Sequence, residues 1–304
     1  MNARPILCVG ALIADLMMQL PELPRSAGKH LPKGARLVVA GMATSAATAV
    51  ARLGHPVSLW ASIGDDAVGD ILAGALAAEG IGSDLVRRVP GAMSAMSAIF
   101  IDDRGEKIVV PWYAPELLGA PDRLPDFGSF GAVLVDVRWP KAAAIALDGA
   151  RAVSIPAVLD LDVGAREVLA DLAPRASHIV ASLDGARVLL GECQLEEAVA
   201  KLRSLTGAMV VVTDGERGAS WHVPGGPIRH QAAFAVAAVD TNAAGDIFHG
   251  AFMAALAEEM DLAQAVRFSS AAAAIKCTRF GGRDGAPTRG EVDAFLEQRR
   301  LAAH

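Results

Sequence analysis

The segment VDTNAAGDIFHGAF, residues 239–252, combines groups that could carry out acid–base chemistry beside an anion. Asp240 and Asp246 are six positions apart, and only small residues and one amide lie between them. The apolar run that follows predicts a buried helix, whose first N–H groups have no intrahelical partner and lie at the positive end of its dipole. Small residues would let a phosphate approach these groups, and Gly245 is expected to adopt a backbone angle that a larger residue resists. Asp246 is therefore either a helix cap or a general base.

The elements that must position this turn follow a strand–helix alternation. Residues 233–239 are expected to form the strand that leads into it. Six further short runs rich in Val and Ile predict strands buried on both faces, at 5–11, 57–64, 132–137, 157–162, 178–182 and 209–215. Helices are predicted between them at 43–53, 67–79, 141–151, 165–172, 184–190 and 195–205. This spacing indicates one α/β domain over residues 1–304, with a mostly parallel sheet and helices on both faces.

Two regions, about 12–39 and 93–113, break this alternation. Apolar and polar residues alternate there with period two, and DDRGE at 102–106 predicts a hairpin turn. We expect a small antiparallel sheet that projects as a lid, or else an edge extension that only packs. The apolar strands within it are consistent with a homodimer formed through the lid.

Polar residues recur at the carboxyl ends of the predicted strands. They are Arg138, Asp160, Asp162, Ser182 and Thr213. In an open parallel sheet, ligands bind beyond these ends. Because polar residues end most strands, the pattern predicts where a site lies rather than which reaction it performs.

Composition narrows the class of protein. The chain has 304 residues, of which 53% are hydrophobic, and a net charge of −6, which argues against a dedicated nucleic-acid binder and against an anionic membrane surface. No uninterrupted apolar run reaches the roughly 18 residues of a membrane span. The three cysteines show no metal-binding spacing, so we expect a reducing, cytoplasmic location.

The segment DTNAAGD resembles the DTxGAGD signature of the ribokinase-like (PfkB) carbohydrate kinases. Four more segments resemble family elements in the same order: AGMATSAATAVARLG (40–54), SIGDDAVGDILAGALAAEGI (62–81), VTDGERGA (212–219) and GGRDGAPTRGEVDAFL (281–296). The resemblance covers nearly the whole chain, and no GxxxxGK[ST] or protein-kinase catalytic loop competes with it. It implies a ribokinase-like three-layer domain with a β lid.

The resemblance implies ATP-dependent phosphoryl transfer to a sugar hydroxyl. Asp246 matches the family's base, and the N–H groups of Ala243, Ala244, Gly245 and Asp246 would hold the developing charge. Sugar contacts are implied at Asp15, Gly28, Lys29, Gly41 and Ser45. Nucleotide contacts are implied at Thr213, Gly215 and Gly218, while His249 either touches ATP or packs in the interior.

Metal cofactors follow from the same resemblance. Magnesium would accompany ATP, and backbone near Asp240 and Asn242 would bind a monovalent cation, usually potassium. The family's NxxE segment, which organises water around magnesium, is SLDG here. Ser182 replaces the Asn and Gly185 the Glu, so Asp184 is one position off. Such departures, with Ala243 in place of a glycine, leave open a weakly catalytic sugar- or nucleotide-binding protein of this fold.

Three segments are similar to the sulfofructose kinase branch, which phosphorylates 6-deoxy-6-sulfofructose. They are AVLVDVRWP (132–140), FHGAF (248–252) and IKCTRFGGRDGAP (275–287). In that branch an arginine binds the sulfonate, and its position matches Arg138. The guanidinium of Arg138 could donate hydrogen bonds to two oxygens of such an anion. Alternatively, Arg138 pairs with Asp136 or Asp162. The branch's lid asparagine falls at Pro111, so kinases for another keto sugar, a sugar phosphate or a nucleoside remain alternatives.

Overall fold

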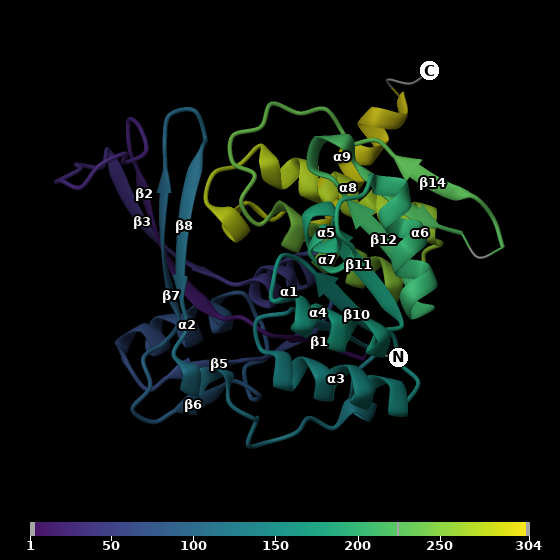
Figure 1. The fold of residues 1–304 in the computed structure, drawn as a ribbon, viewed down its shortest axis with the longest axis horizontal. Helices are drawn as coiled ribbons and strands as arrows, with labels where there is room; N and C mark the ends of the chain where they lie inside the picture. The colour runs from purple at the N-terminus through teal and green to yellow at the C-terminus, as the bar shows by residue number, and fades with distance from the viewer. Residues whose placement is uncertain (1–3, 224, 302–304) are drawn as a thin grey trace.

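The computed structural model describes residues 4–223 and 225–301, which form a large central sheet with helices on both faces and a smaller projecting sheet (Figure 1). The central sheet has the strand order β14-β13-β12-β11-β10-β9-β1-β4. Its strands are β1 (Ile6–Val9), β4 (Val57–Trp60), β9 (Ala132–Val135), β10 (Ala157–Leu161), β11 (His178–Ser182), β12 (Met209–Thr213), β13 (Ala219–His222) and β14 (Ile228–Gln231). All pairs from β4 to β12 are parallel, whereas β13 and β14 join antiparallel. The predicted mostly parallel sheet is confirmed.

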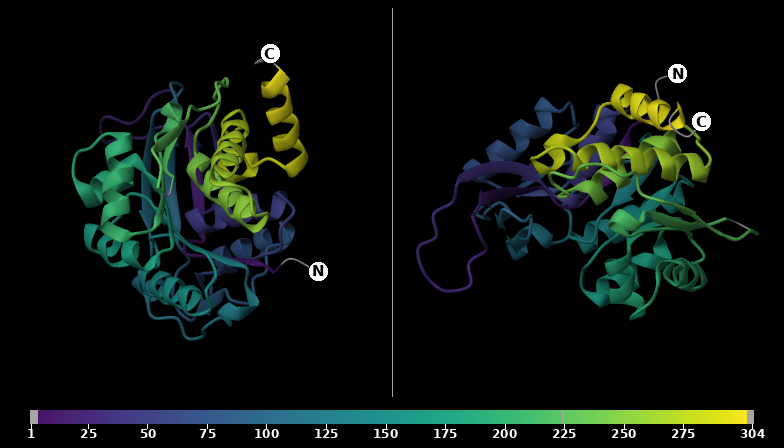
Figure 2. Two further views of the ribbon diagram at one scale, coloured as in Figure 1. Left: turned by 90° about the vertical axis from the view of Figure 1, so that its right-hand side faces the viewer. Right: turned by 90° about the horizontal axis from the view of Figure 1, so that it is seen from above.

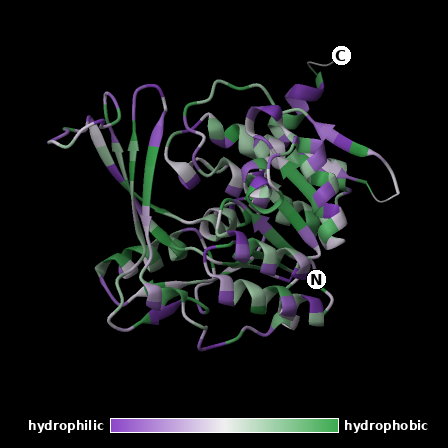
Figure 3. Cartoon of the chain, viewed as in Figure 1, coloured by the Kyte–Doolittle hydropathy of each residue, from purple (hydrophilic) through white to green (hydrophobic). Residues whose placement is uncertain are grey.

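Helices cover the two faces of this sheet in separate layers (Figure 2). One layer contains α3 (Pro140–Ala152), α4 (Arg166–Leu172), α5 (Leu183–Leu190) and α6 (Leu195–Thr206). The other contains α1 (Met42–Arg52), α2 (Ala67–Ala78), α7 (Ala244–Ala257), α8 (Leu262–Cys277) and α9 (Arg289–Leu301). An apolar core lies on each side of the sheet, and Figure 3 shows the central strands as strongly hydrophobic. The predicted three-layer architecture is confirmed.

Two predicted strands differ from the structure. The run 57–64 divides, because after β4 the chain leaves the central sheet and β5 (Ser62–Gly64) pairs with β6 (Arg87–Val89) instead. The segment 233–239 is not a strand. It follows the edge strand β14 and joins no ladder, although the N–H of Val239 donates to the carbonyl of Cys277 at 2.7 Å.

The smaller sheet contains β2 (Ile13–Gln19), β3 (Gly34–Ala40), β7 (Met96–Ile101) and β8 (Lys107–Trp112) in the order β3-β2-β7-β8. The two outer pairings are antiparallel, as predicted, and the central pairing of β2 with β7 is parallel. All six residues of β8 are exposed, including the apolar Val110 and Trp112. This smaller sheet, called the lid below, therefore projects from the body of the domain over the carboxyl ends of the central strands (Figure 1).

Candidate active site

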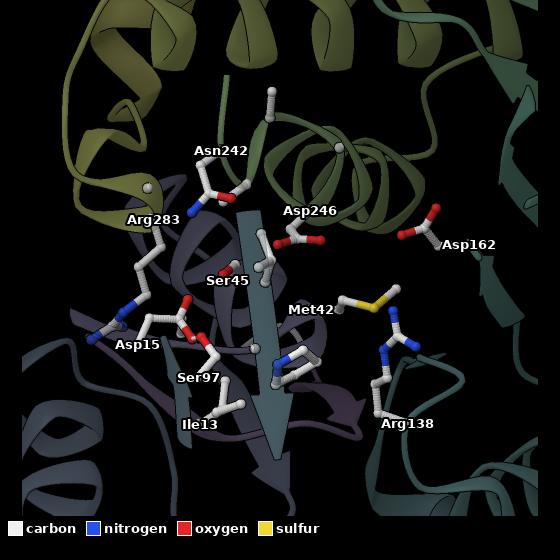
Figure 4. Close-up of a pocket in the computed structure, with 18 of the residues that line it drawn as sticks. Ile13, Asp15, Met42, Ser45, Ser97, Arg138, Asp162, Asn242, Asp246 and Arg283 are labelled. Atoms are coloured by element: carbon white, nitrogen blue, oxygen red, sulfur yellow. Dashed lines mark hydrogen bonds between the residues drawn. The ribbon is translucent and has the colours of Figure 1, made fainter. Parts of the chain in front are cut away.

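A cavity of about 420 Å³ lies between the lid, the carboxyl ends of the central strands and the start of α7 (Figure 4). Its lining contains many residues predicted for the site: Asp15, Gly41, Ser45, Arg138, Ser182, Thr213, Asn242, Ala243, Ala244, Gly245, Asp246 and His249. These residues come from separate regions of the sequence. The fold therefore brings the predicted sugar, nucleotide and base positions to one place.

Other predicted residues lie outside this lining. Gly28 and Lys29 are exposed in the loop between β2 and β3. Gly215 and Gly218 have φ values of 51° and 94° in the turn that follows β12. A Cβ on Gly218 would come within 2.1 Å of the carbonyl oxygen of Gln231. These two glycines shape the loop beside the predicted nucleotide end rather than facing the cavity.

In the turn before α7, the unusual backbone angle belongs to a different residue from the one predicted. Ala243 is the N-cap residue and is left-handed, with φ 61°. Gly245 is in the helix, and a Cβ placed on it would meet nothing within 4 Å. The expectation for Gly245 was therefore wrong, because the helix begins at Ala244, two residues before Asp246. An alanine in this conformation costs roughly 1–2 kcal/mol.

Asp246 is the third residue of α7, beyond the N-cap, and its carboxylate faces the middle of the cavity (Figure 4). Burial raises its pKa to about 8, and the negative charges of Asp160, Asp162 and Asp136 act in the same direction, while His249 opposes them. A carboxylate with such a pKa is a stronger base than a free one. The geometry therefore favours the general-base interpretation over the helix cap.

Behind Asp246 lie two buried polar groups. Asp160, at the end of β10, is 1% exposed, and its Oδ1 accepts no hydrogen bond within the described part of the chain. The Nε2 atom of His249 lies 3.1 Å from the carbonyl oxygen of Val180 and 3.4 Å from that Oδ1. One carboxylate oxygen of Asp160, one of Asp246 and one ring nitrogen of His249 all lie within 4.8 Å of one another. His249 is thus mostly buried and still lines the cavity, and the charge states of these three groups influence one another.

Arg138 follows β9 and points into the cavity (Figure 4). Its backbone N–H donates to Asp136 at 2.8 Å, but its guanidinium has no hydrogen bond or ion pair with any described residue. The other oxygen of Asp136 accepts two further backbone N–H groups, and Asp162 accepts from the hydroxyl of Ser182 at 2.7 Å. The alternative in which a neighbouring carboxylate holds the guanidinium is therefore wrong in this structure.

Asp136 has a positioning role that sequence reasoning missed. It is fully buried and accepts backbone N–H groups of Ala11, Ala43 and Arg138 at 2.8, 3.1 and 2.8 Å. A Cβ on Gly10 would collide with its carboxylate at 2.1 Å. It thus fixes the end of β1, the start of α1 and the backbone of Arg138. The only signal in the sequence is a carboxylate directly after a buried strand.

The far side of the cavity carries Asp15 and Arg283 (Figure 4). The hydroxyl of Ser97 donates to Asp15 at 2.5 Å, while burial raises the pKa of this carboxyl group. Arg283, which sequence reasoning missed, is 4% exposed and donates to the hydroxyl of Thr48 at 2.7 Å and to the carbonyl of Val39. Arg283 therefore joins residues 281–296, the closing segment, to β3 and α1.

The residues at the predicted magnesium-organising segment do not fit the family's arrangement. A Cβ on Gly185 would lie 2.4 Å from the carbonyl oxygen of Leu161, so no glutamate fits there without a backbone shift. Asp184 lies outside the cavity lining, with its side chain 77% exposed and 3.2 Å from Arg187. Asp184 therefore does not replace the missing carboxylate, and this segment does not form a magnesium-organising site of the family's kind.

The predicted potassium position is also altered. Lys276, at the end of α8, is fully buried, and its ammonium group lies 2.5 Å from the carbonyl oxygen of Asp240 and 3.1 Å from its Oδ2. Burial lowers the pKa of Lys276, whereas the charge of Asp240 acts in the opposite direction. A positive side chain therefore contacts the backbone carbonyl of Asp240, within the segment whose backbone the resemblance assigns to a monovalent cation.

Comparison with known proteins gives matches along almost the whole chain. The sequence model described as "pfkB family carbohydrate kinase" matches residues 3–289. A ribokinase of Bacillus subtilis is 28% identical, covering 96% of this chain and 99% of its own, and an ATP-dependent ribose-1-phosphate kinase of Halopiger xanaduensis is 29% identical over 97% and 98%. A crystal structure of an Agrobacterium tumefaciens protein, provisionally described as a ribokinase, superposes with a TM-score of 0.94 at 43% identity over 99% of each chain.

Proposed function

The chain belongs to the pfkB family of carbohydrate kinases, and on that premise we propose that its sugar substrate carries an anionic group, with 6-deoxy-6-sulfofructose as the leading candidate. The protein is a phosphotransferase with an alcohol acceptor, and ATP is the phosphoryl donor. The observation that supports an anionic sugar is the guanidinium of Arg138, which faces the cavity without a partner among the described residues. A half-buried guanidinium such as this one is stabilised most by an oxyanion that accepts two of its hydrogen bonds.

The proposed reaction uses groups that face one another across the cavity. Asp246 accepts the proton of the attacking sugar hydroxyl, and the oxygen of that hydroxyl forms a bond to the γ-phosphorus as ADP leaves. The backbone N–H groups at the start of α7, from Ala243 to Asp246, stabilise the negative charge on the transferred group. Asp15 hydrogen-bonds sugar hydroxyls, and Arg138 fixes the anionic end.

The remaining predicted contacts complete this proposal. Gly41, Ser45, Ser182 and Thr213 all line the cavity. In this proposal Gly41 and Ser45 contact the sugar, and Ser182 and Thr213 contact the nucleotide together with the Gly215–Gly218 turn. Magnesium would accompany ATP. Gly28 and Lys29, at the exposed end of the lid, would contact substrate only when that loop approaches the cavity.

A homodimer through the lid belongs to the same proposal. The strand β8 exposes Val109, Val110 and Trp112, which are 46, 55 and 48% accessible, and it is an edge strand. Exposed apolar edge strands favour association with another sheet. Light scattering on the purified protein measures this directly: a mass near twice that of the chain is expected, and a monomer contradicts the lid contact.

A sugar phosphate is the second candidate for the anionic substrate. The Halopiger relative is named a ribose-1-phosphate kinase, and a phosphate presents the same tetrahedral oxygens as a sulfonate. A nucleoside is less favoured, because Tyr113 is the only Phe, Tyr or Trp residue in the described cavity lining and a base requires a stacking surface. A weakly catalytic protein is disfavoured, because Asp246 lies where a base is needed.

The test compares three proteins on charged and neutral sugars. Hydrogen bonds to charged groups contribute about 1.5–3 kcal/mol, so Arg138→Ala should raise KM for the anionic substrate by roughly ten- to several-hundred-fold. Turnover of neutral fructose should remain within a few-fold of wild type. Arg138→Lys should recover only part of the loss, since an ammonium group cannot form the paired, planar hydrogen bonds that a guanidinium forms with two oxygens. An equal loss on sulfofructose, fructose 6-phosphate and fructose would show that Arg138 is structural.

A further inference from the structure

We propose that the ammonium group of Lys276 takes the place of the monovalent cation behind residues 240–246, the catalytic turn, so that this kinase needs no potassium. The inference rests on the kinase activity of the family and not on which sugar is phosphorylated. It is based on the contacts of one buried side chain at the end of α8.

The first step concerns what the ammonium contacts. Its Nζ donates to the carbonyl oxygen of Asp240 at 2.5 Å and lies 3.1 Å from the carboxylate Oδ2 of the same residue. The side chain is 0% exposed, so solvent cannot satisfy this charge. A charge so deeply buried persists only when it is paired, and Asp240 provides the counter-charge.

The second step concerns what Asp240 holds together. Its Oδ1 accepts the N–H of Asn242 at 2.8 Å, and its Oδ2 accepts the N–H groups of Gly281 and Gly282 at 3.0 and 2.9 Å. The N–H groups of Val239 and Asp240 donate to the carbonyl of Cys277 at 2.7 and 3.1 Å. The start of the catalytic turn is thus joined to the closing segment by contacts that surround the Lys276 ammonium.

The third step concerns the consequence for the phosphate site. Asn242, Ala243, Ala244 and Gly282 line the cavity, so the ammonium lies directly behind the backbone proposed to receive the transferred phosphoryl group. A positive charge there adds to that of the α7 N-terminus and favours a nearby anion. An ammonium group and a potassium ion carry the same charge and are similar in size, so either can coordinate these oxygens.

The two cations exclude each other. Two positive charges within a few ångströms in a partly buried region repel strongly. The backbone carbonyl of Asp240, which lies in the segment expected to bind a free ion, already accepts from the ammonium, and Oδ2 of the same residue lies 3.1 Å from it. A covalently attached cation also needs no capture from solution, so the turn is fixed at any potassium concentration.

The experiment measures ADP release in potassium, sodium or tetramethylammonium chloride at equal ionic strength, with any sugar that the wild type phosphorylates. The wild type should vary by less than about twofold. Lys276→Ala should lose at least tenfold in tetramethylammonium and regain most of it with potassium or ammonium ions. Lys276→Met fills the same space without charge and should lose activity without rescue.

A readout without any sugar separates this inference from the substrate proposal. The affinity for ADP and the melting temperature of Lys276→Ala should both rise with added potassium, while those of the wild type should not. Two results would overturn the inference: a several-fold activation of the wild type by potassium, or full activity of Lys276→Ala in tetramethylammonium. If Lys276→Ala does not fold in either salt, the wild-type salt series still decides the question.

Discussion

The catalytic turn and the lid face each other across one cavity and are stabilised in different ways. The turn is fixed from behind: Asp240 accepts three backbone N–H groups and the Lys276 ammonium, and α7 is almost entirely buried after Asp246. The lid strand β8 is exposed along its whole length and contributes Lys107 and Val109 to the cavity. From this difference we expect changes at the turn to act mainly on the rate of phosphoryl transfer and changes in β8 to act mainly on sugar binding, in addition to the proposed contact of Arg138.

The largest effect is expected at the catalytic turn itself. Asp246→Asn removes the proposed base and should reduce kcat by roughly 10²–10⁴-fold. Affinity for ADP should change little, because the backbone N–H groups remain. Steady-state kinetics with calorimetric ADP titration measures both quantities. Near-full activity of Asp246→Asn would show that Asp246 is not the general base. It would also contradict the expectation that the turn acts mainly on the rate and β8 mainly on sugar binding.

The same variant has a consequence for stability. The pKa of Asp246 is about 8 in the folded state, well above that of an unfolded carboxyl group near 4, so the wild type loses stability as pH rises between these values. The amide of Asp246→Asn cannot ionise and should show no such loss from this site. Urea unfolding at pH 5 and pH 8.5 should therefore favour the variant only at the higher pH. Equal pH dependence of the two proteins would contradict the raised pKa.

The groups behind the base should shift the pH at which it works. In the wild type, kcat should rise with pH up to about 8 as Asp246 ionises. Asp160→Asn removes a negative neighbour and should move this rise to lower pH, whereas His249→Gln removes the opposing partner and should move it to higher pH. Asp184→Asn, outside the cavity, is the matched control. Losses that are uniform across pH would assign Asp160 and His249 a packing role only.

A smaller effect, on binding rather than rate, is expected at the lid. Lys107 lines the cavity from the exposed strand β8, and solvent-accessible charge pairs contribute about 1 kcal/mol or less. Lys107→Ala should therefore raise KM for an anionic sugar a few-fold and leave kcat within about twofold. Lys33→Ala, a lid residue paired with Asp103 outside the lining, is the control. A large loss in kcat would show that the lid takes part in the chemical step.

The smallest effect is expected at Ala243. Its left-handed conformation favours glycine, so Ala243→Gly should relieve strain and stabilise the fold by about 1 kcal/mol, with activity equal or slightly higher. Thermal unfolding and kcat measure the two effects. A marked loss of activity in a folded variant would show that the methyl group contributes to the site.

Features set by local pattern could be predicted from the sequence. The alternation of apolar runs indicated the strand–helix units, and the small residues before α7 indicated the turn that we propose binds an anion. Arg138 and Asp246 were found because one follows a buried strand and the other opens a helix within a family motif. In each case the deciding interaction lies within a few residues along the chain.

Features set by distant partners could not be predicted. The carboxylate of Asp136 accepts the N–H of Ala11, 125 residues away, and Lys276 reaches Asp240 across 36 residues. The segment 233–239 has a strand-like composition, but whether it pairs depends on a neighbouring strand that the sheet does not provide. The ammonium group behind the catalytic turn was missed for the same reason, since the sequence does not show where the Lys276 side chain points.

The most direct test of the central claim is the ratio of kcat/KM for 6-deoxy-6-sulfofructose to kcat/KM for fructose on the wild-type enzyme. The two sugars differ in the anionic group that Arg138 is proposed to bind. Hydrogen bonds to a charged group worth about 1.5–3 kcal/mol correspond to a preference of roughly ten- to more than a hundredfold for the charged sugar. A preference of that size, or the same preference for a sugar phosphate, supports an anionic substrate. Equal or better turnover of fructose would contradict it.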